Sequence, residues 1–528
     1  MRINSKLLIL TMLVMMIACV SAVSATDING TDDVSDIMEV DEVTDVVEDV
    51  EIDDVSEDVV EEDGSDINEE CGCCPIGANS VIVNDTNYVN YFDSTTGWTT
   101  TSNNLTFVGS FTPKTFGNFK IGSSIIINAC NATFTNVGFD LKVSYITLCG
   151  GTFIGDATTN LTSVISAVAD HATIKCVTMN VTSPQNRNFY AIDIENSDIT
   201  LIKNNIYLAC NYSNARNYTY VVRVNSGNNL KMVKNTIAGI LPMKSIDYEN
   251  YTGVDQDFVA GIAISGSHDI NFTNNTIDLT ANDRLGSYPT LDAFLIYTSH
   301  RANIEKNYIT VKDIVSQEGQ NSYIYGIDAF ECDNLTINNN TITMNADHSG
   351  GYIGGNGTGA AYCLQFTGPY EGAVISNNVL TTKNHGPNAA IYSQNWGGKT
   401  NLTIINNTIS VTGKGTDQTW DLLTGIELQD DYAVVTGNTI TVTNTGSYSS
   451  GYNVYGISYC QYSPRTHTYI ITNNTVDVTN GRYTVYIMDG EGCNITGNIL
   501  SSHYPRHSYS GNQTVYITGN NNYVGPNP

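Results

Sequence analysis

An asparagine recurs along the chain inside short segments such as "NLTIINNTIS" (401–410) and "NLTINNNTIT" (334–343). When this residue is position zero, apolar residues recur at positions minus five, minus three and plus two, as Leu402, Ile404 and Ile409 do around Asn407. Alternation at period two predicts β-strands, because a helix would need apolar residues three and four apart. The anchor asparagines are Asn204, Asn235, Asn275, Asn307, Asn340, Asn378, Asn407, Asn438, Asn474, Asn498 and Asn520.

The spacing of the anchors, from 22 to 40 residues, is typical of a solenoid. A second strand is expected upstream of each anchor, as in "YGIDAF" (325–330), "TGIELQ" (424–429) and "AGIAIS" (260–265). A single coil cannot bury its own apolar face, but coils stacked at the strand spacing of about 4.8 Å form a continuous core. The sequence therefore predicts an all-β fold, a parallel β-helix that is right-handed by the general preference of parallel crossovers.

The anchor asparagine is expected to have two structural roles. The bend between strands needs a left-handed backbone, which asparagine tolerates better than most residues with a side chain. Superposed asparagines can also donate and accept hydrogen bonds along the axis, so an amide ladder is expected.

The N-terminal region is predicted to precede the fold in two parts. Residues 1–25 resemble a signal peptide, because Arg2 and Lys6 precede an apolar run that ends at small residues. Residues 26–78 form an acidic spacer with 21 Asp or Glu between positions 27 and 70, a composition expected to be disordered. Residues 79–528 are then the β-helix. We expect a secreted, extracellular or cell-surface protein without a transmembrane anchor after signal cleavage.

Twelve cysteines are present, and three of them lie in "CGCCP" at the end of the spacer. This cluster is too compressed for a zinc site, so a disulfide within the domain or between chains is expected instead. Cys130, Cys149, Cys176 and Cys210 lie in apolar strands and are predicted to be small core residues.

The coils resemble the right-handed parallel β-helix repeats of pectate-lyase-like proteins. The arrangement of signal peptide, acidic spacer and "NNTI" coils resembles adhesin-like surface proteins of methanogenic archaea. The resemblance implies the fold, and the same scaffold carries lyases, hydrolases and non-catalytic surface proteins.

Longer coils gain their extra length mainly after the strand that follows the anchor, so the insertions are expected along one side, where binding surfaces form. Aromatic residues in these loops and neighbouring bends suit carbohydrate rings or a protein partner. The ligand-binding candidates are Trp396, Trp420, Tyr352, Tyr448 and Tyr452, and packing of the loop bases is the alternative role.

Of the Asn-x-Ser/Thr sequons, the loop residues Asn250 and Asn356 are the glycosylation candidates, because the asparagines of "NNT" are expected to be packed.

Seven residues before the anchors, a polar column is expected in successive coils: His268, His300, Asp333, Glu371, Thr400, Asp431, His467 and Glu491. Neighbours in this column would lie about 5 Å apart, close enough to share a cation, and an exposed polar bend is the simpler interpretation. If the protein is an enzyme, the candidate catalytic residues are Asp328, Glu331, Asp333, Glu371, His300 and Arg301.

The motifs of active β-helix enzymes are not found. Polygalacturonase-like hydrolases carry "NTD", "DD", "GHG" and "RIK" in that order, whereas this chain has only the "DD" of Asp430 and Asp431. No metal site or cofactor is predicted for the fold, although calcium could bind the acidic residues. A pI near 4.3 argues against nucleic acid as a partner. The sequence favours a non-catalytic, adhesin-like protein that binds carbohydrate, a cell-surface polymer or a surface protein. The alternatives are a polysaccharide lyase or glycoside hydrolase, and a structural coat protein of the cell wall.

Overall fold

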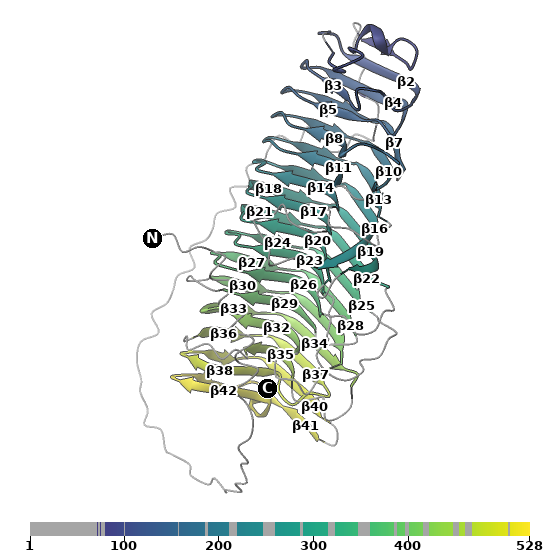
Figure 1. The fold of residues 1–528 in the computed structure, drawn as a ribbon. Helices are drawn as coiled ribbons and strands as arrows, with labels where there is room; N and C mark the ends of the chain where they lie inside the picture. The colour runs from purple at the N-terminus through teal and green to yellow at the C-terminus, as the bar shows by residue number, and fades with distance from the viewer. Residues whose placement is uncertain are drawn as a thin grey trace, which may run out of the picture. The chain divides into compact units, whose positions relative to one another are not determined.

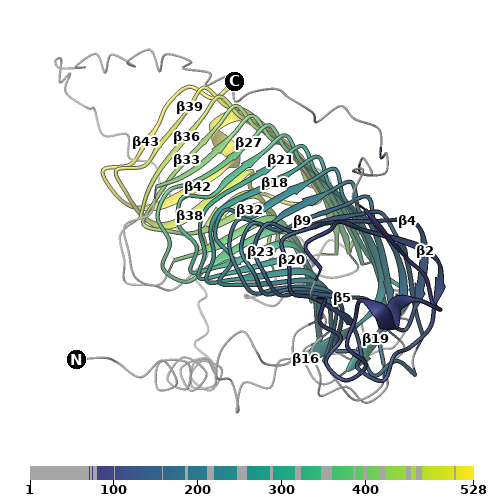
Figure 2. The ribbon, with the colours of Figure 1, turned by 90° about the horizontal axis from the view of Figure 1, so that it is seen from above.

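A computed structural model describes residues 71, 74, 80–99, 101–156, 158–184, 188–210, 219–245, 259–285, 289–314, 323–346, 360–384, 388–395, 401–414, 422–446, 453–459, 467–504 and 507–528. Residues Cys71–Pro528 form one compact unit. Its strands stack into a parallel β-helix in which each regular coil supplies three strands (Figures 1 and 2). The prediction of an all-β parallel solenoid is confirmed, with three strands in each regular coil where the sequence indicated at least two.

Every third strand pairs in parallel, so three sheets run along the unit. The first sheet contains β3 (Phe119–Ile121), β5 (Phe139–Leu141), β8 (Ser163–Ala167), β11 (Phe189–Ile194), β14 (Thr219–Asn225), β17 (Val259–Ser265), β20 (Pro289–Tyr297), β23 (Tyr323–Phe330), β26 (Ala360–Thr367), β29 (Asn388–Gln394), β32 (Leu423–Gln429), β35 (Val454–Tyr459), β38 (Val485–Glu491) and β42 (Val515–Asn520).

The second sheet follows the first within each coil. It contains β6 (Thr147–Cys149), β9 (Thr173–Lys175), β12 (Thr200–Ile202), β15 (Lys231–Val233), β18 (His268–Thr273), β21 (His300–Glu305), β24 (Thr336–Asn338), β27 (Ala373–Ser376), β30 (Leu402–Ile405), β33 (Tyr432–Thr436), β36 (Thr468–Thr472), β39 (Asn494–Thr496) and β43 (Tyr523–Val524).

The third sheet follows the anchor asparagines. It contains β7 (Thr152–Gly155), β10 (Thr178–Thr182), β13 (Asn205–Ala209), β16 (Thr236–Ser245), β19 (Thr276–Leu285), β22 (Tyr308–Asp313), β25 (Thr341–Ala346), β28 (Val379–Asn384), β31 (Thr408–Gly413), β34 (Thr439–Asn444), β37 (Thr475–Thr479) and β40 (Ile499–Tyr504).

The two ends of the solenoid are less regular. At the N-terminal end β1 (Val81–Val83) pairs with β2 (Leu105–Phe111), which pairs with β4 (Ile126–Thr135), and the short 3-10 helix η1 (Tyr88–Asn90) lies between β1 and β2 in the chain. At the C-terminal end β41 (His507–Ser510) pairs antiparallel with β40 and precedes the 3-10 helix η4 (Gly511–Thr514).

The apolar positions of the repeat face the interior. Leu402, Ile404 and Ile409 are at most 1% exposed, as the period-two pattern predicts. Towards the N-terminal end the core becomes aromatic, because Phe107 contacts the rings of Phe111, Phe119, Phe134 and Phe139 at centroid distances from 5.2 to 5.7 Å. Stacking therefore gives one continuous apolar core through the coils.

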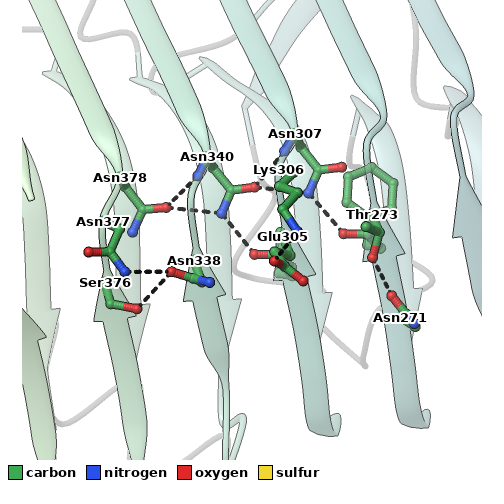
Figure 3. A network of polar contacts seen from close by, with 12 residues as sticks. Asn271, Thr273, Glu305, Lys306, Asn307, Asn338, Asn340, Ser376, Asn377 and Asn378 are labelled. Atoms are coloured by element: carbon green, nitrogen blue, oxygen red, sulfur yellow. Dashed lines mark hydrogen bonds and ion pairs between the residues drawn. The ribbon is translucent and has the colours of Figure 1, made fainter. Parts of the chain in front are cut away.

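The anchor asparagines form the predicted amide ladder at the bend between the second and third sheets (Figure 3). The Oδ1 atom of Asn340 accepts bonds from the backbone N–H and the Nδ2 of Asn307, both at 2.9 Å. The Nδ2 of Asn340 donates to the Ile304 carbonyl at 2.8 Å and to the Oδ1 of Asn378 at 3.0 Å. The same pattern repeats from Asn204 onward, so the ladder satisfies backbone groups that the bend would otherwise bury without partners.

Two details of the ladder correct the expectation. The left-handed residue is the one before the anchor, as Asn339 and Asn406 illustrate with φ of 55°, whereas the anchor itself turns its amide inward. The last ladder residue is Asn527 and not Asn520, because the Oδ1 of Asn527 accepts from the backbone N–H of Asn498 at 2.9 Å. Asn520 ends β42 in the first sheet, where it pairs with Glu491.

Cys130, Cys149 and Cys176 are disulfide-bonded, whereas only a core role was predicted for them, and the disulfide within the domain expected for the "CGCCP" cluster is present. Cys71 bonds Cys176 and Cys74 bonds Cys149, with Cα–Cα distances of 5.7 and 5.8 Å, and Cys130 is also disulfide-bonded. Cys210 is a buried free thiol, as expected. The cysteine cluster is thus tied to the first coils.

No helix among the described residues is long and apolar enough to cross a membrane. The predicted signal peptide and the residues of the spacer before Cys71 lie outside the described residues, so both stay predictions.

Candidate functional site

The outer face of the first sheet carries aromatic, amide and acidic side chains in register. In β23 the apolar Ile324 and Ile327 are at most 1% exposed and belong to the core, while Asp328 is partly exposed between buried neighbours. Parallel pairing places Asp328 beside Gln365 of β26, then Tyr392 of β29 and Glu427 of β32. Because the strand spacing is about 4.8 Å, these side chains form a continuous column.

An aromatic column of Tyr325 and Tyr362 lies beside it on β23 and β26, and Tyr362 also contacts Tyr392 of the polar column. The rings of Tyr325 and Tyr362 stack with centroids 5.6 Å apart, and the Tyr362 and Tyr392 rings lie 5.4 Å apart. Tyr297 and Phe330 stack at 5.0 Å further along β20 and β23. Most of these rings are partly exposed, so they leave ring surface for a ligand.

Towards the N-terminus Leu295 and Ala263 continue the column through Asp328 as apolar residues, and Arg223 and Asp193 then continue it as an ion pair at 2.7 Å. Tyr190, Tyr220, Ala260, Ala263 and Leu295 form a buried cluster that is separate from the main core. The Tyr190 and Tyr220 rings stack at 5.8 Å. Ala263 and Leu295 therefore separate the polar group of β11 and β14 from the column on β23, β26, β29 and β32.

Hydrogen bonds between side chains hold the polar column in place. The Nε2 of Gln365 donates to the Oδ1 of Asp328 at 3.2 Å, and the Nε2 of Gln429 donates to the Oε1 of Glu427 at 2.8 Å. The Tyr392 hydroxyl donates to the Oε1 of Gln394 at 3.2 Å. These bonds leave further donors and acceptors of the amides and carboxyls for a polar ligand.

The acidic groups of this face favour their protonated forms. Burial raises the pKa of Asp328 and of Glu427 to about 7 in each case, because the charged carboxylate loses hydration. Burial, with a smaller contribution from the Asp328 charge, raises the pKa of Asp292 well above its ordinary value. Near pH 7 the face therefore holds carboxyls that can donate as well as accept hydrogen bonds.

The stability of the fold is expected to decrease as pH rises from 5 to 8. The folded pKa of Asp328 and Glu427, about 7, exceeds the ordinary values of 3.8 and 4.5, so the native state binds more protons in this window. The free energy of unfolding should be about 5 kcal/mol larger at pH 5 than at pH 8 from these two groups. Urea unfolding at both pH values measures this difference.

The matched variant for this pH test is Asp328→Asn with Glu427→Gln, which removes both titrating groups while keeping their approximate size. Its unfolding free energy should change less between pH 5 and pH 8 than that of the wild type, and the remaining change is expected from Asp292 and Glu331, whose pKa values burial also raises. A wild-type protein that is more stable at pH 8 than at pH 5 would contradict the assignment.

The remaining catalytic candidates lie at the bend between the first and second sheets, beyond the end of β23. The Nδ1 of His300 lies 3.0 Å from the Oδ2 of Asp333, whose Oδ1 accepts the backbone N–H of Glu371 at 2.8 Å. The His268 and His300 rings stack with centroids 5.0 Å apart. The structure thus superposes these members of the polar column, while Thr400 lies outside the described residues.

Arg301 and Glu331 do not join this cluster. Arg301 forms a two-point ion pair with Asp269 of the preceding coil at 2.6 and 2.8 Å, which also lowers the pKa of that carboxyl. Glu331 has a left-handed backbone with φ of 52°, and burial raises the pKa of its carboxyl. Three or more His, Cys, Asp or Glu side chains that could hold a metal ion come together nowhere in the described part of the chain.

Of the "DD" pair, Asp430 serves the core, whereas Asp431 is partly exposed. The Asp430 side chain is fully buried, where Oδ1 accepts the Tyr370 hydroxyl at 2.6 Å and Oδ2 accepts the Ser393 hydroxyl. Its carbonyl oxygen accepts the Tyr469 hydroxyl at 2.8 Å. Asp430 therefore links coils inside the solenoid and does not face a substrate.

Two sets of candidates lie outside the described residues. They are the ligand candidates of the loops, Trp396, Trp420, Tyr352, Tyr448 and Tyr452, and the glycosylation candidates Asn250 and Asn356. Sequence reasoning missed Glu427, Tyr362 and Tyr392 of the outer face. A signal was present, because "YGIDAF" and "TGIELQ" place Asp328 and Glu427 at the same position of the first-sheet strand.

Comparisons with known proteins identify no family. No family model matches the sequence, and none of the curated proteins matches it. Among solved structures the chain is similar to the A-module of the Azotobacter vinelandii mannuronan C-5 epimerase AlgE6, at 11% identity over 75% of this chain and 90% of that chain, with a TM-score of 0.25. This likeness is too remote to assign an activity, so the function has to be argued from the site.

Proposed function

We propose that this chain is an exported, non-catalytic β-helix protein that binds carbohydrate through the outer face of the first sheet. The observation that carries the proposal is the register-matched pair of columns, in which Tyr325 and Tyr362 lie beside the column of Asp328, Gln365, Tyr392 and Glu427. A glycan of the cell wall or of a neighbouring cell is the proposed ligand, which makes the role adhesin-like. A surface protein is the alternative partner.

The chemistry of this face suits sugars. Sugar rings present an apolar C–H face that packs on a tyrosine ring, and hydroxyls that pair with amide and carboxyl groups. A row of such groups at the strand spacing can contact successive residues of a polysaccharide. Rigid strands hold the side chains in place before binding, so little conformational entropy is lost on binding.

Export is proposed from two observations at the N-terminus. The first residues resemble a signal peptide, and the disulfides Cys71–Cys176 and Cys74–Cys149 are of a kind that persists in oxidising compartments. If the N-terminal segment attaches the protein to its cell, the acidic spacer would separate the β-helix from that attachment.

A polysaccharide lyase or glycoside hydrolase is the second candidate. The observation that favours it is the pKa of about 7 for Asp328 and Glu427, in the range where a carboxyl acts as a general acid near neutral pH. The cluster of His300, Asp333 and Glu371 is less suited to this role, because the backbone N–H of Glu371 already occupies the Oδ1 of Asp333.

One experiment separates the candidates. The purified protein is incubated with uronates and other polysaccharides, with and without calcium, and is tested for retention and for new reducing ends or unsaturated products. Retention without cleavage supports the binding function. Cleavage that disappears in Asp328→Asn would show an enzyme instead of a binding protein. If the protein neither binds nor cleaves any polysaccharide, a structural coat protein of the cell wall becomes the favoured function.

A further inference from the structure

The asparagine before the anchor is a distinct position with its own chemistry. In "NNT" the first asparagine is the sequon residue, and the buried anchor is only the middle residue of the sequon. At this position Asn274, Asn339, Asn406 and Asn473 are all exposed, with φ of 55 to 56°. The expectation that these sequons are packed is therefore wrong, because packing applies to the neighbouring anchor.

These four sequons fall on alternate coils. They belong to the coils anchored by Asn275, Asn340, Asn407 and Asn474, and the coils between them lack a sequon at this bend. The three coils in between differ in the residue that removes the sequon. Lys306 and Gly437 replace the asparagine in two of them, and Val379 replaces the threonine in the third. Sequon asparagines therefore recur at two strand spacings, about 9.6 Å.

The fold does not require asparagine at this position. Lys306 and Gly437 adopt the same left-handed conformation, with φ of 55° and 68°, in coils that stack in the same way. Space is also available beside two of the sequon residues. Gly437 and Gly497 stand in the coils that follow Asn406 and Asn473. A Cβ on Gly437 would lie only 2.3 Å from the Oδ1 of Asn406, and a Cβ on Gly497 only 2.8 Å from the Oδ1 of Asn473. The absence of a Cβ in each glycine therefore leaves room for the sequon side chain.

We propose that Asn274, Asn339, Asn406 and Asn473 are N-glycosylated, so that one bend of the solenoid carries a row of glycans on alternate coils. A spacing of about 9.6 Å gives each glycan lateral room that a single strand spacing would not. The row lies between the second and third sheets and leaves the outer face of the first sheet uncovered. The inference relies on the export part of the proposed function and on nothing else in it.

The modification is a group transfer from a polyprenyl-phosphate-linked glycan by a membrane transferase. The asparagine Nδ2 forms a bond to the anomeric carbon of the sugar and loses one proton. The bond from that carbon to the phosphate oxygen breaks, and the lipid phosphate leaves with the electron pair. Transfer precedes closure of the coil, because the middle residue of each sequon becomes buried in the ladder.

The test is glycopeptide mass spectrometry of the exported, disulfide-bonded protein from its native cells. We expect glycan mass on all four asparagines and none on Asn377, which is followed by Asn378 and Val379. Thr408→Val should remove the glycan from Asn406 alone. The matched control is Thr439→Val in the next coil, which occupies the paired position on the third sheet but belongs to no sequon and should leave every glycan in place.

Predominantly unmodified asparagines at these four positions would overturn the proposal, even if sequons elsewhere in the same molecules carry glycan. That outcome is separable from failure of the carbohydrate-binding function, which is read from retention on polysaccharides. A protein that binds polysaccharide but is unmodified at this bend contradicts only the glycan row.

Discussion

Asn340→Ala is expected to lower the free energy of unfolding by about 3 to 5 kcal/mol, because several buried polar groups lose their partners at once. The backbone N–H and Nδ2 of Asn307 lose their acceptor, and the Ile304 carbonyl loses its donor. The Oδ1 of Asn378 loses one of its two donors. Urea unfolding measures the effect, and faster amide hydrogen exchange at Asn307 should accompany it.

The matched control for the ladder is Asn339→Gly. Asn339 is adjacent, exposed and left-handed, with φ of 55°, and glycine adopts that conformation without strain. Its unfolding free energy should stay within about 0.5 kcal/mol of wild type, the usual range for surface substitutions. Equal losses in the two variants would contradict the structural role of the anchor.

Replacing Cys74 and Cys149 together by alanine is expected to lower the unfolding free energy by about 4 kcal/mol. The disulfide joins residues 75 apart in sequence, so its loss frees a long loop in the unfolded chain. The loss should concentrate in the first coils, where β6 and β9 should gain amide exchange. Thermal unfolding with fragment-resolved hydrogen exchange measures both effects.

Cys210→Ala is the control for the disulfide, because Cys210 is a buried free thiol of a later coil. Cys210→Ala should lower the unfolding free energy by about 1 kcal/mol through lost packing. In the variant that lacks Cys74 and Cys149, a reducing agent should lower the unfolding free energy further only by the contribution of the remaining disulfides. If the double variant unfolds like wild type, the bond does not stabilise the N-terminal coils.

The sequence predicts the repeat well because its signals are local. Leu402, Ile404 and Ile409 alternate within one strand, and superposition of like residues follows once coils stack. The left-handed residue was misplaced by one position, since two adjacent asparagines satisfy the same backbone preference and only the structure distinguishes them. Asn527 was missed because position minus five before it is Asn522, whereas Asn520 follows the apolar Val515 and Ile517 at minus five and minus three and so resembles an anchor.

The candidate site is less visible in the sequence. Cysteine spacing carries no pairing information, so Cys149 and Cys176 could not be matched to the cluster. The outer face depends on register between coils: Asp328 and Glu427 lie about a hundred residues apart and join one column only through Gln365 and Tyr392. Their raised pKa follows from burial, which strand alternation alone does not predict for outward side chains.

The most direct test of the account compares dissociation constants for a retained polysaccharide between Tyr362→Ser and Tyr308→Ser. Tyr362 lies in the aromatic column of the first sheet, and Tyr308 is 63% exposed on the third sheet. We predict at least tenfold weaker binding for Tyr362→Ser, about 1.4 kcal/mol, and unchanged binding for Tyr308→Ser. Unchanged binding in Tyr362→Ser, with the fold intact, would contradict the assignment of the ligand to this face.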